Sequence, residues 1–223
     1  MSIKLIKEQI ADFLTTNDSE VMAIQGDWGI GKTYTWNKVL NECKDRILYS
    51  RYSYVSLFGL NSLDGLKYSI FENAIQRGSI GTEPSLETVR DNAIGISEII
   101  GRKTARLARE IPIVKNFTST IDAVSFMTIK KMIVVIDDLE RRGKGLDVKD
   151  VLGLVSLLKE HKECKVVMLL NNNTSGMEEF KTYKEKVIDR DVTFNPTPEE
   201  CAATAFDGGN DYYDELSKYT ISR

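Results

Sequence analysis

Residues Gly26–Thr33 read Gly-Asp-Trp-Gly-Ile-Gly-Lys-Thr, and this segment is the most informative about the architecture of the chain. It matches the pattern G-x-x-x-x-G-K-[ST], in which backbone N–H groups of a glycine-rich loop surround phosphate oxygens. Glycines are needed because a Cβ atom would hold these amides away from the phosphate. The apolar run Glu20–Gln25 precedes the loop, and a helical pattern from Lys32 to about Lys44 follows it. The sequence therefore predicts a strand, a phosphate-binding loop and a helix N-terminus in succession.

The loop supplies most of the candidate nucleotide-binding residues. Lys32 is expected to reach the β- and γ-phosphates, and the Thr33 hydroxyl is expected to ligate Mg²⁺. Trp28 can face solvent within the loop, and it could pack against a neighbouring helix or subunit or stack near the nucleotide. The full set of expected nucleotide contacts is Gly26, Trp28, Gly29, Ile30, Gly31, Lys32, Thr33 and Tyr34.

A second element of the candidate site, which carries two acidic residues, lies about a hundred residues downstream of the phosphate loop. The apolar run Ile133–Ile136 is typical of a buried strand and ends in Asp137 and Asp138. This is a Walker B pattern, in which a carboxylate at the strand tip holds Mg²⁺ or its water, and Asp137 is the candidate. Asp138 is the first choice for polarising the attacking water, a role that many related ATPases give to Glu, and a strand-end cap is the alternative. Glu140 is the reserve candidate.

Other polar residues follow the predicted strands. Asn171 ends the apolar run Lys165–Leu170, where it could orient water near the γ-phosphate or simply form a turn. Arg141 and Arg142 follow the Walker B strand, and one of them could act as an arginine finger on a neighbouring subunit. Arg190 is a second finger or sensor candidate. For each arginine a structural salt bridge is an equal alternative.

Strands alternate with helices along the chain, which predicts an α/β fold of the P-loop NTPase type with a mostly parallel central sheet flanked by helices. Such sheets bind ligands beyond the carboxyl ends of their strands. Tyr52, Tyr54 and Phe58 share strand parity, which favours core packing for all three. The remaining expected elements are helices over 3–14, 62–76, 147–162 and 177–186, and strands over 51–58 and 191–194.

The predicted P-loop core extends over residues 1–198, and residues 199–223 resemble the start of a partial C-terminal helical lid. Residues 59–130 are expected to form a helical insertion between the second strand and the Walker B strand, with a long helix from Ser85 to about Glu110. Within it, Arg102, Arg106 and Arg109 recur at helical spacing and could bind nucleic acid, although a solvated charged face is favoured.

Composition narrows the classes of protein that fit. The 223 residues suffice for one large domain, and the net charge of −3 gives no overall basic field for nucleic acid. Cys43, Cys164 and Cys201 lack the spacing of metal ligands, which fits a reduced, intracellular protein. No apolar run is long enough to span a bilayer, and the N-terminus has no signal-peptide pattern. A cytoplasmic protein is expected.

Two motifs together resemble the KAP family of P-loop NTPases, within the wider STAND and AAA-like group of additional-strand ATPases. They are G-D-W-G-I-G-K-T at Gly26–Thr33 and I-D-D-L-E-R at Ile136–Arg141, where Glu140 replaces the usual Asp. Residues 185–198 also look like the last core strand of the family and its Pro-rich exit. The resemblance implies an ATP-driven switch or assembly domain, often in bacterial proteins and including phage-defence systems.

The leading hypothesis is an ATP- and Mg²⁺-binding module that hydrolyses ATP and acts as a regulatory or oligomerisation switch in a larger protein. Its expected partners are the nucleotide and either further copies of itself or an effector domain or protein. One alternative is a nucleotide-binding switch with little hydrolysis, which the Asp at position 138 keeps open. The other is an ATP-dependent DNA-binding or remodelling protein, which would use the arginines of the 59–130 insertion.

Overall fold

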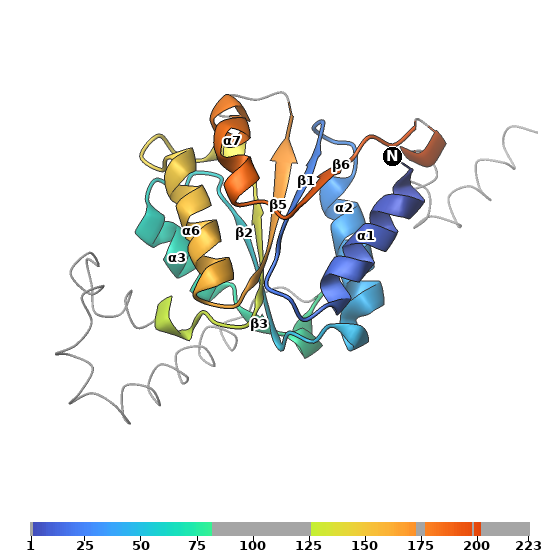
Figure 1. Cartoon of the computed structure of the whole chain (residues 1–223), viewed down its shortest axis with the longest axis horizontal. Helices are drawn as coiled ribbons and strands as arrows, with labels where there is room; N and C mark the ends of the chain where they lie inside the picture. Colours follow the sequence, from blue (N-terminus) through green and yellow to red (C-terminus); the bar gives the residue numbers. More distant parts are fainter. Residues whose placement is uncertain (1, 82–125, 173–176, 198, 202–223) are drawn as a thin grey trace, which may run out of the picture.

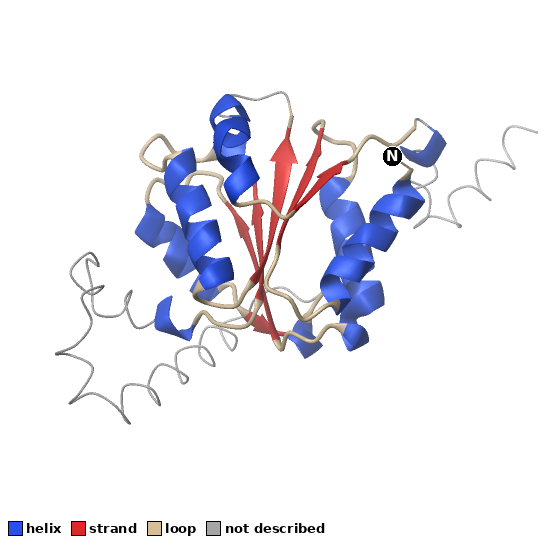
Figure 2. Cartoon of the chain, in the orientation of Figure 1, coloured by secondary structure: helices blue, strands red, loops and turns tan. Residues whose placement is uncertain are grey.

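The computed structural model describes residues 2–81, 126–172, 177–197 and 199–201. In this part of the chain a six-stranded sheet lies between two layers of helices (Figures 1 and 2). The strand order is β3-β2-β4-β5-β1-β6. The strands are β1 (Val21–Gly26), β2 (Arg51–Ser56), β3 (Ile75–Gln76), β4 (Ile133–Asp137), β5 (Lys165–Asn171) and β6 (Arg190–Thr193). The helices are α1 (Ile3–Thr15), α2 (Lys32–Cys43), α3 (Leu63–Glu72), α6 (Val148–Glu160) and α7 (Met177–Tyr183).

All strand pairs are parallel except the pairing of β3 with β2, so the predicted mostly parallel sheet is confirmed. Strand β5 lies between β1, which carries the phosphate loop, and β4, which carries the Walker B residues. The register places Asn171 opposite Gly26 and Ser56 opposite Asp137. The polar residues that follow these strands therefore meet along one edge of the sheet.

Each face of the sheet is covered by its own group of helices, with α1 and α2 on one side and α3, α6 and α7 on the other (Figure 1). Alternation along β1 explains this division, because Met22 and Ile24 join the core under α1 and α2 while Val21 and Ala23 join the other core. Trp36 of α2 is fully buried, and its indole N–H donates to the Tyr52 hydroxyl over 3.2 Å. Burial of each large apolar side chain stabilises the fold by about 1.5–3 kcal/mol.

The helix starts differ in one respect that matters for function. Ser62 and Asp147 cap α3 and α6, each side chain accepting a hydrogen bond from the first turn over 3.1 Å. Helix α2 instead begins after Gly31, whose backbone is left-handed (φ 93°) and which offers no side-chain cap. The first N–H groups of α2 therefore have no side-chain acceptor at this end and suit an anion.

The region after β2 corrects one expectation. A helix was expected to about Gln76, but α3 ends at Glu72, and Ile75–Gln76 forms the antiparallel edge strand β3 against β2. Asn73 ends the helix, because its side-chain N–H₂ donates back to the Ser69 carbonyl and the next residues turn into the sheet. The 59–130 insertion is thus not purely helical. The helix expected from Ser85 and most of the lid lie outside the described residues.

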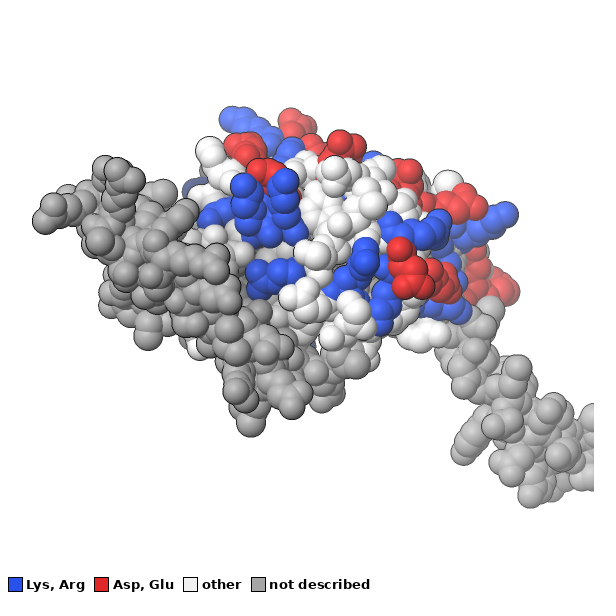
Figure 3. Space-filling model, turned by 90° about the horizontal axis from the view of Figure 1, so that it is seen from below, with Lys and Arg blue, Asp and Glu red and all other residues white. Residues whose placement is uncertain are grey.

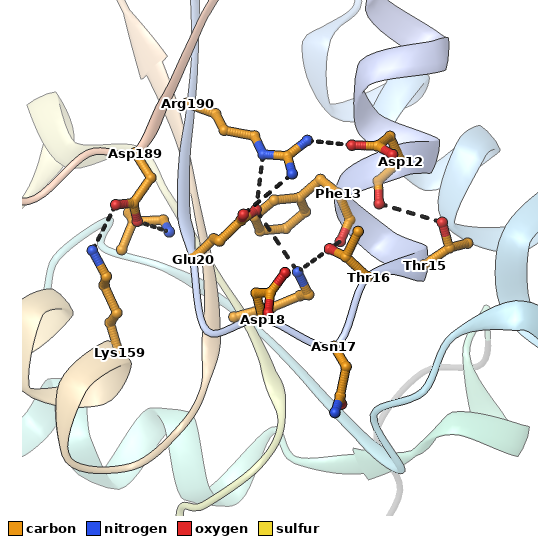
Figure 4. Close-up of polar contacts among 12 residues, drawn as sticks. Asp12, Phe13, Thr15, Thr16, Asn17, Asp18, Glu20, Lys159, Asp189 and Arg190 are labelled. Carbon is orange, nitrogen blue, oxygen red and sulfur yellow. Dashed lines mark hydrogen bonds and ion pairs between the residues drawn. The ribbon is translucent and has the colours of Figure 1, made fainter.

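A network of charged side chains joins the amino ends of the strands (Figure 4). Arg190 pairs with Asp12 over 2.6 Å and with Glu20 over 2.8 Å. Lys165 is fully buried, donates to the Thr16 hydroxyl over 2.8 Å and lies 3.9 Å from Glu20, and burial lowers its pKa. Arg190 lies opposite Met22, near the start of β1 and away from the phosphate loop. Of the two roles considered for Arg190, a finger or sensor and a structural salt bridge, the salt bridge describes its place in the fold.

Candidate nucleotide-binding site

The phosphate loop leaves the end of β1 and enters α2. Gly29 and Gly31 have left-handed backbones, with φ angles of 77° and 93°, which L-residues rarely adopt. At Gly26 a Cβ atom would lie 2.5 Å from the Phe194 carbonyl oxygen and 2.7 Å from the Ile30 side chain. All three glycines are therefore required by the local geometry, which turns the backbone amides toward one concave surface.

Lys32 lies across this loop. Its Nζ atom donates to the carbonyl oxygens of Gly26 and Asp27 over 2.8 and 2.7 Å. Partial burial lowers the pKa of Lys32, and the nearby carboxylates, Asp137 foremost, oppose this shift. The loop carbonyls therefore hold the amine where a phosphate chain wrapped by the loop would lie.

The side chain of Asp137 is fixed by three donors. Its Oδ2 atom accepts from the Thr33 hydroxyl over 3.2 Å and from the Tyr54 hydroxyl over 2.6 Å, and its Oδ1 atom accepts from the Asp138 N–H over 2.7 Å. Burial raises the pKa of Tyr54, and the hydrogen bond to Asp137 raises it further. The phenol therefore stays protonated near neutral pH and remains a hydrogen-bond donor.

A hydroxyl and a carboxylate in contact are oxygen ligands that suit Mg²⁺, which binds through one or two protein groups plus phosphate oxygens and water. Thr33 and Asp137 therefore fit this ion. Within the described ranges no group of three or more His, Cys, Asp or Glu side chains could hold a metal by itself. A magnesium ion at this site would depend on the nucleotide phosphates for its remaining ligands.

Asp138 follows β4 with a left-handed backbone, at φ 59°. Its carboxylate accepts from the Ser56 hydroxyl over 2.6 Å and lies 3.7 Å from the Arg141 guanidinium. Arg141 was expected to act as a finger or to pair within its own chain, and in this structure it pairs within its own chain. Arg142 bonds the Leu139 and Leu146 carbonyls. Both arginines thus have partners in the segment that follows β4.

These elements enclose a cavity of about 250 Å³ at the carboxyl edge of the sheet. Of the expected site residues, Gly26, Ile30 and Arg141 are absent from its lining. Gly26 packs beneath the loop, Ile30 packs against the core under α1 and α2, and Arg141 turns toward Asp138. The lining residues are Trp28, Gly29, Gly31, Lys32, Thr33, Tyr34, Asp137, Asp138, Glu140, Leu170 and Asn171.

Sequence reasoning missed two residues of β2 at this site. Tyr54 and Ser56 hydrogen-bond Asp137 and Asp138, which was not predictable before β2 was known to lie beside β4. The expectation that Tyr52, Tyr54 and Phe58 all pack in the core is correct for Tyr52, holds in part for Tyr54, which packs against the rim of the same core, and is wrong for Phe58. Tyr54 is half-buried at the site, and Phe58 is 64% exposed because β2 ends at Ser56. The alternation of side chains between the two faces ends with the strand, so it does not extend to Phe58.

A model of the KAP family P-loop domain matches residues 3–202 of the chain. The chain belongs to this family. No curated protein sequence matches this KAP domain. In the helices that the structure describes, none combines the length and apolar character needed to cross a bilayer.

Solved structures with similar folds have low sequence identity to this KAP domain. A chain of the Drosophila ORC bound to DNA has 16% identity and a TM-score of 0.49, covering 94% of this chain and 45% of its own. A Walker-type ATPase of Pyrococcus abyssi has 14% identity and a TM-score of 0.45, covering 95% of this chain and 58% of its own. The Pif1 helicase of Candida albicans has 12% identity and a TM-score of 0.43, covering 96% of this chain and 42% of its own. This KAP domain thus spans less than two thirds of each of these chains.

The arginines weighed for nucleic-acid binding, Arg102, Arg106 and Arg109, lie outside the described residues. On the face seen from below, Lys and Arg lie beside Asp and Glu (Figure 3). Among the described residues, Lys130 and Lys131 each pair with Glu163, over 3.2 and 3.1 Å. Mixed charges of this kind give no support to a nucleic-acid surface.

Proposed function

We propose that this KAP domain binds ATP with Mg²⁺, hydrolyses it, and acts as a regulatory or oligomerisation switch within a longer protein. The observation that supports this best is the joining of the phosphate loop to the Walker B strand, where Thr33 donates to Asp137 over 3.2 Å. The two residues expected to bind Mg²⁺, Thr33 and Asp137, are thus in contact. A phosphate-binding loop without this contact would bind an anion but not position a metal.

Each residue has a separate task in this proposal. The loop amides and Lys32 hold the phosphates, and Thr33 and Asp137 hold the ion, which neutralises charge on the phosphate oxygens when bound. Asp138 accepts a proton from the attacking water or orients it. Asn171 lies opposite Gly26 at the end of the intervening strand and orients the same water. The exposed Trp28 and the neighbouring Tyr34 contact the rest of the nucleotide.

The biological role follows from the family resemblance rather than from the site. Switch or assembly behaviour, with further copies of the chain or an effector as partner and antiviral defence as one setting, is part of the proposal on that basis. A cytoplasmic location belongs to it as well.

A nucleotide switch that scarcely hydrolyses is the second candidate, and one observation favours it. Asp138 is a methylene shorter than the Glu that many related ATPases use, and both of its carboxylate oxygens have partners in its own chain. A carboxylate held in this way could leave hydrolysis slow.

Single-turnover hydrolysis of ATP separates the two candidates. Asp138→Asn should reduce the rate at least a hundredfold, as expected for loss of a general base, while keeping nucleotide affinity. Lys32→Ala should lose binding, and Asp64→Asn, which removes a carboxylate on α3, serves as the control. A wild type that binds ATP but hydrolyses it no faster than ATP decays without protein would favour the non-hydrolysing switch. Competition between ATP and GTP for binding would define the base preference.

A further inference from the structure

Four residues form a closed ring of contacts around the carboxylate of Asp138, and we call Ser56, Phe58, Asp138 and Arg141 the Asp138 clasp. Ser56 Oγ donates to Asp138 Oδ2 over 2.6 Å and accepts from the Phe58 N–H over 3.2 Å. On the other side, Arg141 Nη1 lies 3.7 Å from Asp138 Oδ1, and the guanidinium carbon lies 4.2 Å from the centroid of the Phe58 ring. Phe58 is thus linked to both carboxylate oxygens of Asp138, to Oδ2 through Ser56 and to Oδ1 through Arg141.

Backbone hydrogen bonds fix the position of Phe58 relative to this carboxylate. They connect the loop after β2 to the segment after β4 on both sides of the clasp, so the two loops form one unit. The bonds join Leu57 N to Asp137 O (2.8 Å), Gly59 N to Arg141 O (3.2 Å) and Gly143 N to Leu60 O (2.7 Å). The ring of Phe58 is therefore held over Arg141 by its backbone and not by core packing.

The exposure of Phe58 indicates that core packing is not its role. Phe58 is 64% exposed, although most large apolar side chains of the described sheet and helices are buried. Arg141 is 46% exposed, and an exposed ion pair of this length is weak by itself. An aromatic face beneath the guanidinium adds a cation–π interaction and reduces the rotameric freedom of the arginine. Phe58 and Asp138 together therefore restrain Arg141 more than either does alone.

We propose that Phe58 and Arg141 are positioning residues that keep the carboxylate of Asp138 directed at the attacking water. This inference rests on the proposed function, in which Asp138 acts on that water. Because an Asp has one methylene fewer than a Glu and leaves β4 from a left-handed backbone, its reach depends on the orientation of a short side chain. A displacement of the carboxylate by about 1 Å can reduce a rate by two orders of magnitude.

Substitution of Phe58 tests the clasp without touching the phosphate loop. Phe58→Ala should reduce the single-turnover rate about tenfold and leave the Kd for ATP unchanged, since Phe58 stacks on Arg141 and does not line the nucleotide cavity. Phe58→Tyr should keep the wild-type rate, and Phe58→Leu should behave like the alanine variant because it lacks a π face. Tyr183→Ala is the matched control, because it removes another partly exposed ring that lies under a cation, Lys149, and has no contact in the clasp.

A series of fluorinated phenylalanines at position 58 tests the contact itself. Each added fluorine weakens the negative face of the ring at nearly constant shape, so the rate should fall stepwise with fluorination. A ring that acts only as a structural spacer would give a flat series. Phe58→Ala combined with Arg141→Ala should be no slower than Arg141→Ala alone, because both changes break the same ring of contacts.

The outcomes separate the clasp from the function on which it rests. If Asp138→Asn is inactive while Phe58→Ala hydrolyses like the wild type, the clasp is wrong and the proposed function stands. If Phe58→Ala hydrolyses faster than the wild type, the contacts restrain the carboxylate rather than direct it, and the clasp is again wrong. If Asp138→Asn hydrolyses like the wild type, both the assignment of Asp138 and the clasp are wrong.

Discussion

Replacement of Tyr54 by Phe tests how the magnesium side of the site is built. The substitution keeps the ring and removes the hydroxyl that donates to Asp137 Oδ2 over 2.6 Å. Hydrogen bonds to a charged group contribute about 1.5–3 kcal/mol, so roughly a 10- to 100-fold loss in Mg²⁺ affinity follows. The fold should tolerate the change, because Tyr54 lies at the rim of its core and not within it.

The assay is a titration of Mg²⁺ into protein with a fixed concentration of fluorescent ATP analogue, read as the midpoint for formation of the ternary complex. Tyr54→Phe should shift this midpoint to higher Mg²⁺, while binding of the analogue without Mg²⁺ stays unchanged. Tyr49→Phe is the matched control, because that hydroxyl donates to backbone carbonyls at the opposite end of the sheet. An unchanged midpoint in Tyr54→Phe would refute the inference that Tyr54 orients Asp137 for the ion.

Three further substitutions test the fold, one at the phosphate loop and two at the amino ends of the strands. Gly26→Ala should lower stability by about 1–3 kcal/mol and weaken ATP binding, because its Cβ would meet the Phe194 carbonyl oxygen; unaltered thermal melting and affinity would contradict the close packing of the loop. Arg190→Met should cost about 1 kcal/mol of unfolding free energy in a urea titration and leave ATP affinity unchanged; a loss of affinity would instead place Arg190 at the site. Burial raises the pKa of the Cys164 thiol from 9.0 to about 11, so its contribution to stability is complete below pH 9 and is lost as the pH rises toward 11. The unfolding free energy of Cys164→Ala should therefore fall less steeply over this interval than that of the wild type, by about 1–3 kcal/mol in total, and equal slopes would contradict the assignment.

The elements of the fold were predictable from the sequence because their signals are local. Apolar runs that end in polar residues marked β1, β4 and β5, and the glycine pattern placed the turn between β1 and α2. The order of the strands brings Asn171 opposite Gly26, at the end of the strand between the two Walker strands, as the resemblance to additional-strand ATPases implies. The edge strand β3 was missed because it has only two residues. A segment this short shows no hydrophobic periodicity by which a strand can be distinguished from the end of a helix.

The polar contacts around the two aspartates were not predictable, since they depend on which strands are neighbours. Tyr54 and Ser56 look like ordinary strand residues until β2 is placed beside β4 in register. Phe58 was misassigned because parity was extended past the end of the strand. The left-handed backbone of Asp138 likewise has no sequence signal, because Asp occurs in many conformations at strand ends.

The account as a whole depends on the binding of Mg-ATP at Gly26–Thr33 and Asp137, and isothermal titration calorimetry measures this directly. The wild-type protein should give saturable heat with ATP in the presence of Mg²⁺, and Lys32→Ala should give none. At a ligand concentration 100 times the Kd, the same binding should stabilise the wild type by about 2.7 kcal/mol in thermal unfolding. A folded wild-type protein that gives neither heat nor a shift in melting temperature with any nucleoside triphosphate would contradict the account.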